Sequence, residues 1–189
     1  ARRETGFLDR AVIVGGATRR YQVFVPPGWT ADRLWPVVLF LHGSGERGDD
    51  GLLPTEVGLG SAIRRHVDRF PCLVIFPQCP NDVWWSDGAV VEQAAVALEQ
   101  TVAEFRGDPA RRVLTGLSMG GYGIWSLAAQ RPGTFAALAP ICGGIRRPPG
   151  YPPPLGSPPE DPNVDPYAEC ARKLGKVPVW VFHGDADVF

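Results

Sequence analysis

The sequence predicts an α/β domain with a mostly parallel central sheet and helices on both of its faces. Continuous apolar runs typical of buried strands alternate with helical patterns, and several of these runs end in glycine-rich loops. No repeat or domain-scale linker divides the 189 residues, so we expect one domain over residues 1–189. Because right-handed crossovers bring the carboxyl ends of parallel strands to one edge, the loops that follow the strands should meet there.

The amino-terminal part supplies a hairpin, two buried strands and a helix. Residues 11–25 read as two strands around Gly15-Gly16, a pair that favours a tight hairpin turn. Residues 35–41 and 73–76 are continuous apolar runs, as expected for strands that are covered on both faces. Residues 55–70 carry apolar side chains at helical spacing, so they are predicted to form the helix between these strands.

The carboxy-terminal part continues the alternation. It is predicted to contain a helix over 89–105, a strand at 113–114, a helix from residue 122, a strand over 135–142, a helix over 167–174 and a strand over 177–182. Gly107 closes the first of these helices, and Ser86 or Asp87 is available to cap its start. Residues 148–166 are too rich in proline for a helix or a central strand. We expect a surface loop there, either a lid that contacts substrate or an inert excursion.

Residues 116–120 read Gly-Leu-Ser-Met-Gly and directly follow a predicted strand. This Gly-x-Ser-x-Gly spacing is typical of a nucleophile elbow, a sharp strand-to-helix turn that lifts a serine hydroxyl out of the end of a sheet. Gly116 and Gly120 leave room for the reversal, which forces a strained backbone at the serine. The helix that follows aims N–H groups at Ser118, where an oxyanion would form. We therefore predict that Ser118 is a nucleophile.

Composition and charge exclude several classes of partner. With 19 basic and 20 acidic residues the net charge is -1, so the chain lacks the basic surface that nucleic acid or an anionic membrane requires. No apolar stretch approaches the roughly 18 residues that span a bilayer. The four cysteines have neither the density of a disulfide framework nor the spacing of a metal site. They leave the compartment open, and we favour a soluble, secreted protein over a cytoplasmic one.

Four segments together resemble those of the α/β-hydrolase fold, and within it the bacterial esterases grouped with the phospholipase/carboxylesterase and polyhydroxybutyrate-depolymerase-like families. The segments are LHGSGERG at 41–48, GLSMGGYGIW at 116–125, APICGG at 139–144 and VPVWVFHGDAD at 177–187. The resemblance implies a three-layer fold and a serine carboxylic-ester hydrolase that acts through an acyl-enzyme. It implies no metal and no organic cofactor.

The resemblance also assigns roles to individual residues. The nucleophile falls on Ser118, and the triad acid falls on Asp187, the second aspartate of the His-Gly-x-x-Asp motif. The backbone N–H groups of Met119 and Ser44 would hold the oxyanion, and one such donor typically lowers the barrier by about 3 kcal/mol. An aspartate in this role fixes the tautomer of a histidine base and stabilises the imidazolium that forms.

The histidine base has no match in the sequence. In this fold the triad order is serine, acid and histidine, so the base is expected after Asp187, yet the sequence ends at Phe189. His42 is instead predicted to anchor the oxyanion loop, His183 to support a strand end and His66 to be a solvated helix residue. We therefore expect a fragment that lacks a final strand, helix and histidine loop, about 30 to 50 residues. That segment or a second chain would complete the fold.

The loop at 77–88 points to the kind of ester. It lies near the site in the related families, so we expect Trp84 and Trp85 to contact substrate, with packing against the sheet as the alternative. Gly43, in the glycine-rich loop at 42–51, is also expected to contact substrate. Together with the neutral charge balance, these tryptophans favour an uncharged short-chain or aryl ester, a feruloyl-type ester included. Two other functions fit the same motifs: a serine peptidase of prolyl-oligopeptidase type and a non-catalytic binding module.

Two further groups of residues are given structural roles. Tyr122 and Trp125 lie three residues apart on one helix and are expected in the core. The acidic residues of the glycine-rich loop are interpreted as solvated or paired with Arg47 rather than as a cation site. These acidic residues are Glu46, Asp49 and Asp50.

Overall fold

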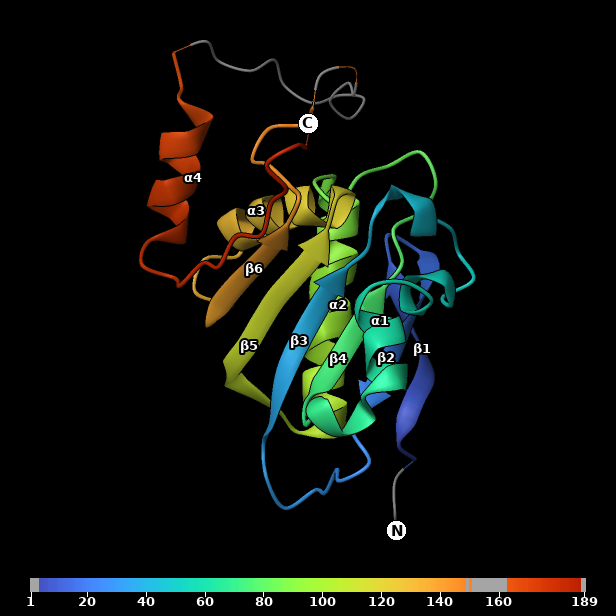
Figure 1. Cartoon of the computed structure of the whole chain (residues 1–189). Coiled ribbons are helices and arrows are strands. Elements are labelled where there is room, and N and C mark those ends of the chain that lie inside the picture. Colours follow the sequence, from blue (N-terminus) through green and yellow to red (C-terminus); the bar gives the residue numbers. More distant parts are fainter. Residues whose placement is uncertain (1–3, 149, 151–162, 188–189) are drawn as a thin grey trace.

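The structure, a computed structural model, describes residues 4–148, 150 and 163–187. A six-stranded sheet in the order β1-β2-β4-β3-β5-β6 forms its centre (Figure 1). The strands are β1 (Gly6–Val14), β2 (Ala17–Val25), β3 (Trp35–Leu41), β4 (Leu73–Pro77), β5 (Gly107–Leu117) and β6 (Ala137–Ile141). β1 and β2 pair antiparallel, as do β2 and β4, whereas β4, β3, β5 and β6 are parallel. The mostly parallel sheet predicted from the sequence is confirmed.

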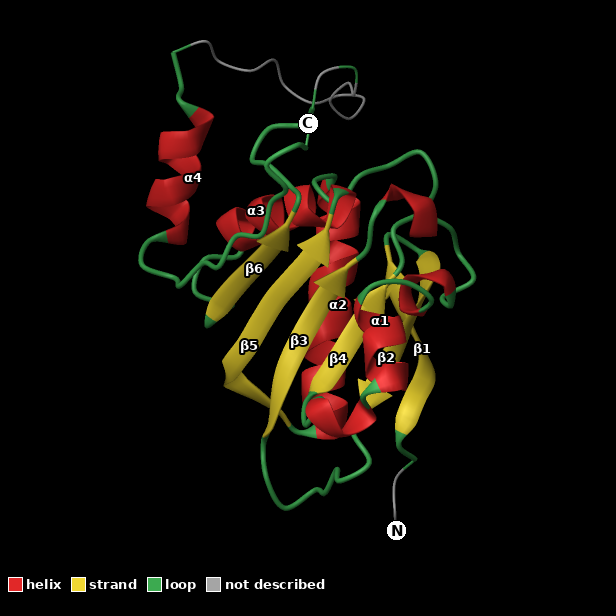
Figure 2. Ribbon diagram, in the orientation of Figure 1, coloured by secondary structure: helices red, strands yellow, loops and turns green. Residues whose placement is uncertain are grey.

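Helices cover both faces of the sheet and give the predicted three layers (Figure 2). They are α1 (Leu59–Arg65), α2 (Gly88–Phe105), α3 (Met119–Gln130) and α4 (Pro166–Leu174), with short 3-10 turns η1 (Ser44–Glu46), η2 (Leu53–Thr55) and η3 (Val67–Arg69). α2 and α3 bury apolar side chains such as Leu98 and Ile124 in the larger core. α1 packs Ile63 against Phe40 and Phe76 in a second core on the opposite face. The sheet is therefore packed between two apolar cores, one on each face.

The amino-terminal hairpin forms as predicted. β1 pairs with β2 along its whole length, from Gly6 opposite Val25 to Val14 opposite Ala17. The turn consists of Gly15 and Gly16, with φ of 58° and 78°. Two successive positive φ angles are the requirement of a tight hairpin turn whose twist matches that of the strands, and glycine adopts them without strain.

Three predicted helix boundaries were wrong. The helix predicted over 55–70 is limited to α1, because Gly58 enters with φ of 56° and η3 follows as a separate 3-10 turn. The left-handed residue that ends α2 is Arg106, with φ of 56°, rather than Gly107. α3 begins directly after Ser118 instead of at Tyr122. Most of the proline-rich loop predicted at 148–166, residues 149 and 151–162, lies outside the described residues.

The predicted last strand lies beside β6 at the edge of the sheet. Its backbone forms parallel bridges between Leu138 and Val179 and between Ile141 and Phe182, with hydrogen bonds of 2.8 to 2.9 Å. Trp180 and Phe182 stack with ring centroids 5.0 Å apart and are 72% and 43% exposed. Figure 1 shows no helix over β5 and β6 on the side of the sheet that carries α1. Among the described residues, this part of the sheet is therefore an uncovered apolar face.

Candidate active site

The carboxyl ends of the parallel strands meet at one edge of the sheet, shown at the top of Figure 1. A cavity of about 100 Å³ lies there and is lined by Ser44, Trp84, Ser118, Met119, Tyr122, Cys142, Pro148 and Asp187. The structure therefore brings together residues from five separate loops and turns that the sequence analysis placed at strand ends. Asp187, Ser118 and the two proposed oxyanion residues all belong to this set.

Ser118 stands on a strained turn between β5 and α3. Its φ of 52° and ψ of -120° lie in a region that costs a non-glycine residue on the order of 1–3 kcal/mol. The turn is held from both sides, because the Ser118 N–H donates to Ile141 O at 2.9 Å and Ser118 O accepts from the Tyr122 N–H at 3.1 Å. The surrounding structure thus maintains a conformation that this residue would otherwise avoid, and it presents the hydroxyl to the cavity.

The glycines on either side of Ser118 are required by close backbone contact. A Cβ atom at Gly116 would lie 2.4 Å from Leu41 O, and one at Gly120 would lie only 1.9 Å from the same oxygen. Both distances are far below van der Waals contact, and the obstructing atom belongs to the backbone of β3. The elbow can approach β3 so closely only because these two positions carry no side chain.

Two backbone N–H groups are available beside Ser118. Met119 is the first residue of α3, so its N–H has no acceptor inside the helix and lies at the positive end of the helix dipole. Ser44 begins η1 and lines the same cavity. The loop is close, since a Cβ atom at Gly43 would lie 3.7 Å from Ser118 Cβ. The residues expected to donate to an oxyanion, Ser44 and Met119, therefore line the same cavity as Ser118.

Residues 42–51, called the oxyanion loop below, are anchored by a buried histidine. His42 Nε2 accepts a hydrogen bond from the Cys79 N–H at 2.9 Å, so Nδ1 carries the proton and donates to Gly43 O at 2.6 Å. The Trp85 indole N–H donates to His42 O at 2.9 Å, and its ring packs edge-on against the imidazole. Burial lowers the pKa of His42 to about 4, so the ring is neutral near pH 7.

Gln78 is a second anchor, which the sequence analysis missed. Its amide nitrogen donates to Glu46 O at 3.1 Å, and its amide oxygen accepts from the Gly51 N–H at 2.6 Å. The side chain is 2% exposed, and its own carbonyl accepts from Gln93 at 2.7 Å. The available signal was a glutamine directly after a buried strand, where an amide can satisfy one donor and one acceptor of an adjacent loop.

The expected pairing of Arg47 with an acidic neighbour does not form among the described residues. Arg47 instead donates to Ser44 O at 3.1 Å and to Val83 O at 3.4 Å, which ties the oxyanion loop to the tryptophan loop. Glu46 Oε2 is buried, has no hydrogen-bond partner within the part of the chain that the structure describes, and lies 4.0 Å from His42 Nδ1. Because His42 is neutral, this contact is not an ion pair at pH 7.

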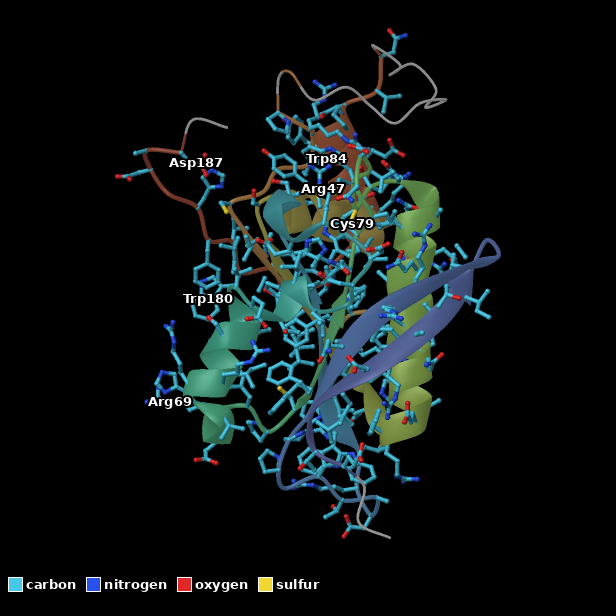
Figure 3. The ribbon with its side chains drawn as sticks, turned by 90° about the vertical axis from the view of Figure 1, so that its right-hand side faces the viewer. Arg47, Arg69, Cys79, Trp84, Trp180 and Asp187 are labelled. Carbon is cyan, nitrogen blue, oxygen red and sulfur yellow. The ribbon has the colours of Figure 1, made fainter. Side chains whose placement is uncertain are left out.

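The two neighbouring tryptophans have different roles. Trp84 lines the Ser118 cavity, as the sequence analysis expected of both indoles. Trp85 does not line it, since its side chain is 1% exposed and lies beneath the oxyanion loop. Figure 3 shows Trp84, Arg47 and Cys79 close together at the active edge of the sheet. The local sequence does not decide which indole reaches the cavity. Trp85 is held beneath the backbone of His42, directly after β3, whereas Trp84 lies at the cavity wall.

Tyr122 and Trp125 were wrongly expected in the core. Tyr122 is half-buried and lines the Ser118 cavity, because the first turn of α3 lies at the edge of the sheet rather than beneath it. Burial and the charge of Asp187 raise the pKa of the Tyr122 hydroxyl. Trp125 is also half-buried and lines a neighbouring cavity. Cys142, with φ of 44°, and Pro148, at the start of the proline-rich loop, complete the wall; both follow β6, whose carboxyl end was expected at this edge.

The loop at 183–187, called the acid loop below, contains Asp187, which lines the cavity. Figure 3 shows Asp187 at the same end of the molecule as Trp84. Asp187 Oδ2 lies 3.4 Å from His183 Nε2. His183 itself is 37% exposed and lines a separate open groove with Phe182. His66 lies at the end of α1. None of the three histidines therefore lines the Ser118 cavity as the described residues define it.

Other features of the described residues offer less chemistry. A larger groove of about 540 Å³ lies between the hairpin and residues 50–52, but its lining contains no serine, cysteine or histidine. All four cysteines are free, and no three His, Cys, Asp or Glu side chains of the described chain are grouped to hold a metal ion. Within the same residues, no helix combines the length and apolar composition needed to cross a bilayer.

Comparisons with known proteins agree on one family. The family model "Putative esterase" (Esterase) matches residues 15–187. The chain is 29% identical over 184 residues to "Putative esterase NocK" of Nocardia uniformis subsp. tsuyamanensis, covering 94% of this chain and 48% of that protein. It superposes on the crystal structure of a thermostable esterase with a TM-score of 0.76 and 31% identity, covering 96% of this chain and 47% of that chain.

A more distant solved structure shares the fold. LpqC, a poly(3-hydroxybutyrate) depolymerase from Bordetella parapertussis, superposes with a TM-score of 0.67 at 20% identity, covering 98% of this chain and 68% of that one. The present chain spans about half the length of NocK and of the thermostable esterase.

Proposed function

Because the chain belongs to the Esterase family, we propose that it provides the nucleophile and oxyanion hole of a serine carboxylic-ester hydrolase. The predicted resemblance to bacterial α/β-hydrolase esterases is confirmed by this membership and by the fold. One observation carries the proposed mechanism. Ser118 lies on a strained elbow at the start of α3, in a cavity that it shares with Ser44, Met119 and Asp187.

In the proposed reaction, Ser118 Oγ attacks the ester carbonyl carbon while a histidine base takes the hydroxyl proton. The carbonyl oxygen becomes an anion that the N–H groups of Met119 and Ser44 stabilise. Collapse of the tetrahedral intermediate breaks the ester C–O bond, and the same histidine protonates the departing alcohol. Water then attacks the acyl-enzyme by the reverse sequence of proton transfers and releases the acid.

The base in this proposal is a histidine outside the described residues. His42 is excluded because both of its ring nitrogens are engaged in holding the oxyanion loop. His183 contacts Asp187 from a different groove and does not line the Ser118 cavity. We propose that further polypeptide, C-terminal or from a second chain, supplies the base beside Asp187 and covers the apolar face around Trp180 and Phe182. Exposed apolar patches of this kind are typical of contact surfaces.

The size of the cavity favours short acyl groups in the proposed substrate. Its volume is about 100 Å³, smaller than the cavity of about 150 Å³ that is known to bind benzene. Trp84, Met119 and Tyr122 give it an apolar lining suited to an uncharged acyl chain. Of the two ester classes expected from the sequence, uncharged short-chain esters therefore fit better than aryl or feruloyl-type esters.

Covalent labelling with a fluorophosphonate tests the proposal in the intact protein. We expect one label, located by peptide mass spectrometry on Ser118, together with hydrolysis of p-nitrophenyl acetate. Ser118→Ala should abolish the label and lower kcat by at least about 10⁴-fold. Ser61→Ala, on α1 and away from the cavity, serves as the matched serine control.

The same experiment separates the rival functions. An unlabelled Ser118 in the intact protein would favour the binding module, and faster turnover of an aminoacyl amide than of the ester would favour the peptidase.

A further inference from the structure

A second cavity adjoins the one that contains Ser118. Its volume is about 170 Å³, and it lies between α3 and α4. Its lining includes residues from α3 (Tyr122, Trp125, Ser126 and Ala129), from α4 (Glu169, Cys170 and Lys173), and Ile145 and Arg147 between them in the chain. Tyr122 lines both cavities, so its ring stands at their boundary. The smaller cavity contains the nucleophile and the larger one does not.

The ring of Tyr122 is held in place by stacked neighbours. It packs edge-on against Trp84, with ring centroids 5.9 Å apart and planes at 80°. Trp84 in turn contacts Arg147, whose guanidinium carbon lies 4.7 Å from the centre of the Trp84 ring. Aromatic and cation–π contacts of this geometry add attraction beyond the burial of area. Tyr122 is therefore supported by a layer two residues deep.

The supporting layer is itself anchored to the start of α2. Arg147 donates to Asp87 Oδ1 and to Ser86 Oγ, both at 2.6 Å. The other carboxylate oxygen of Asp87 accepts from the Trp84 N–H at 3.0 Å. The side chains of Arg147 and Asp87 are only 15% and 16% exposed, so this ion pair is well shielded from water. Trp84, Arg147 and Asp87 thus hold one another in place, and Trp84 in turn supports the ring of Tyr122.

We propose that Tyr122 determines the specificity of the site by setting the largest acyl group that it accepts. This inference rests on the proposed esterase function and adds the identity of the limiting side chain. With the ring in place, an acyl chain bound at Ser118 has only about 100 Å³. Without the ring, the chain extends into the second cavity along Trp125 and Ile145. The native enzyme accordingly takes short acyl groups, because the Tyr122 ring keeps longer acyl chains out of the second cavity.

Acyl-chain profiles of the intact enzyme test this proposal. The readout is the ratio of kcat/KM for p-nitrophenyl octanoate to that for p-nitrophenyl acetate. We expect Tyr122→Ala to raise this ratio by about tenfold or more, because even one ill-fitting methylene changes kcat/KM by roughly 10–200-fold. Tyr122→Phe keeps the ring and should leave the ratio as in the parent enzyme. Tyr122→Leu, which also shortens the side chain, provides a second test if the alanine variant does not fold.

Two controls locate the effect at the boundary. Trp125→Ala enlarges only the second cavity, so it should not change the ratio while Tyr122 is present. Adding Ala129→Phe to Tyr122→Ala should fill the second cavity and restore the preference for acetate. An equal gain from Trp125→Ala, or no gain from either Tyr122→Ala or Tyr122→Leu, would overturn the proposal.

The failures of the two proposals can be told apart. If the parent enzyme hydrolyses no ester and Ser118 takes no fluorophosphonate, the esterase function is wrong and this inference is wrong with it. If the parent hydrolyses acetate but the Tyr122 variants keep its chain-length limit, only the inference is wrong. A change in preference for the alcohol at constant acyl group would show that Tyr122 faces the leaving group instead, which also contradicts it.

Discussion

The oxyanion loop is fixed to the end of β4, whereas the acid loop extends from the edge of the sheet. In the oxyanion loop, His42 accepts from the Cys79 N–H, and the Gly48 N–H donates to Cys79 O at 3.0 Å. In the acid loop, the Asp187 N–H donates to Gly184 O at 3.2 Å, a contact within the loop itself. The oxyanion loop is thus anchored by the buried side chains of His42 and Gln78, whereas every residue of the acid loop is exposed.

The difference shows that this chain fixes the proposed oxyanion donors firmly but holds the proposed acid less firmly. Donors that stabilise an oxyanion act best when they need no rearrangement during the reaction. The oxyanion loop meets this requirement, since backbone and buried side-chain groups of Gln78 and Cys79 fix it. The acid loop follows the segment of Trp180 and Phe182, whose apolar side chains are exposed among the described residues. Its final position should depend on what covers that face.

Matched glycine substitutions provide the strongest test of this contrast. Gly120→Ala places a methyl group 1.9 Å from the Leu41 carbonyl oxygen, so we expect it to lower the free energy of unfolding by about 3 kcal/mol or more. Gly184→Ala in the acid loop meets no atom within 4 Å and should change it by less than about 0.5 kcal/mol. Urea unfolding of both variants provides the measurement. Similar losses for the two would show that the end of β3 at Leu41, where the oxyanion loop begins, is no more tightly packed than the acid loop.

The buried imidazole predicts a pH dependence of stability. The pKa of His42 is lowered from 6.5 to about 4 because burial disfavours its charged form. The unfolded chain therefore binds the extra proton first, so this stabilisation is complete above pH 6.5 and is lost as the pH falls toward 4. The total is about 3 kcal/mol. Urea unfolding at several pH values should show this loss in the parent, and His42→Gln should flatten the curve. A parent curve that is already flat over this range would contradict the assignment.

Gln78 gives a smaller effect with a kinetic signature. Gln78→Ala leaves Glu46 O and the Gly51 N–H without their partner, which should cost about 2 kcal/mol of stability. Because it loosens the oxyanion loop, we expect kcat to fall about tenfold while KM changes little. Gln130→Ala removes an exposed amide that contacts only Ser126 in the described chain, and it serves as the matched control. A change in KM without a change in kcat would indicate a role in substrate binding instead.

Local patterns were sufficient to predict the fold. The buried strands were predicted because continuous apolar runs are informative without knowledge of their neighbours, and the parallel sheet followed from their alternation with helices. The turn at Ser118 was predicted because its glycine spacing reflects a steric requirement within five residues. The helix at 55–70 was overextended because Gly58 and the 3-10 turn after His66 interrupt an otherwise helical pattern.

The site was only partly predictable, because its walls depend on packing between distant segments. The local sequence does not distinguish Trp84 from Trp85. Trp85 is buried in the fold, where its indole N–H donates to the carbonyl of His42, some forty residues earlier in the chain. Tyr122 has the helical spacing of a core residue, and only the position of α3 at the edge of the sheet turns it toward a cavity. Gln78 belongs to no recognisable motif, because a glutamine after a buried strand does not by itself indicate which backbone groups its side-chain amide will bind.

The attachment of the oxyanion loop to β4 also sets the timescale on which that loop can open. β4 pairs with β2 on one side and with β3 on the other. The amide protons of Gly48 and Gly51 are bound to Cys79 O and to the Gln78 side chain, directly beyond that strand. Because these anchors adjoin the central sheet, we expect the two protons to exchange with solvent more slowly than the amide protons of the acid loop. The position of the proposed oxyanion donor is then tied to the stability of the central sheet, whereas that of the proposed acid is tied only to its edge.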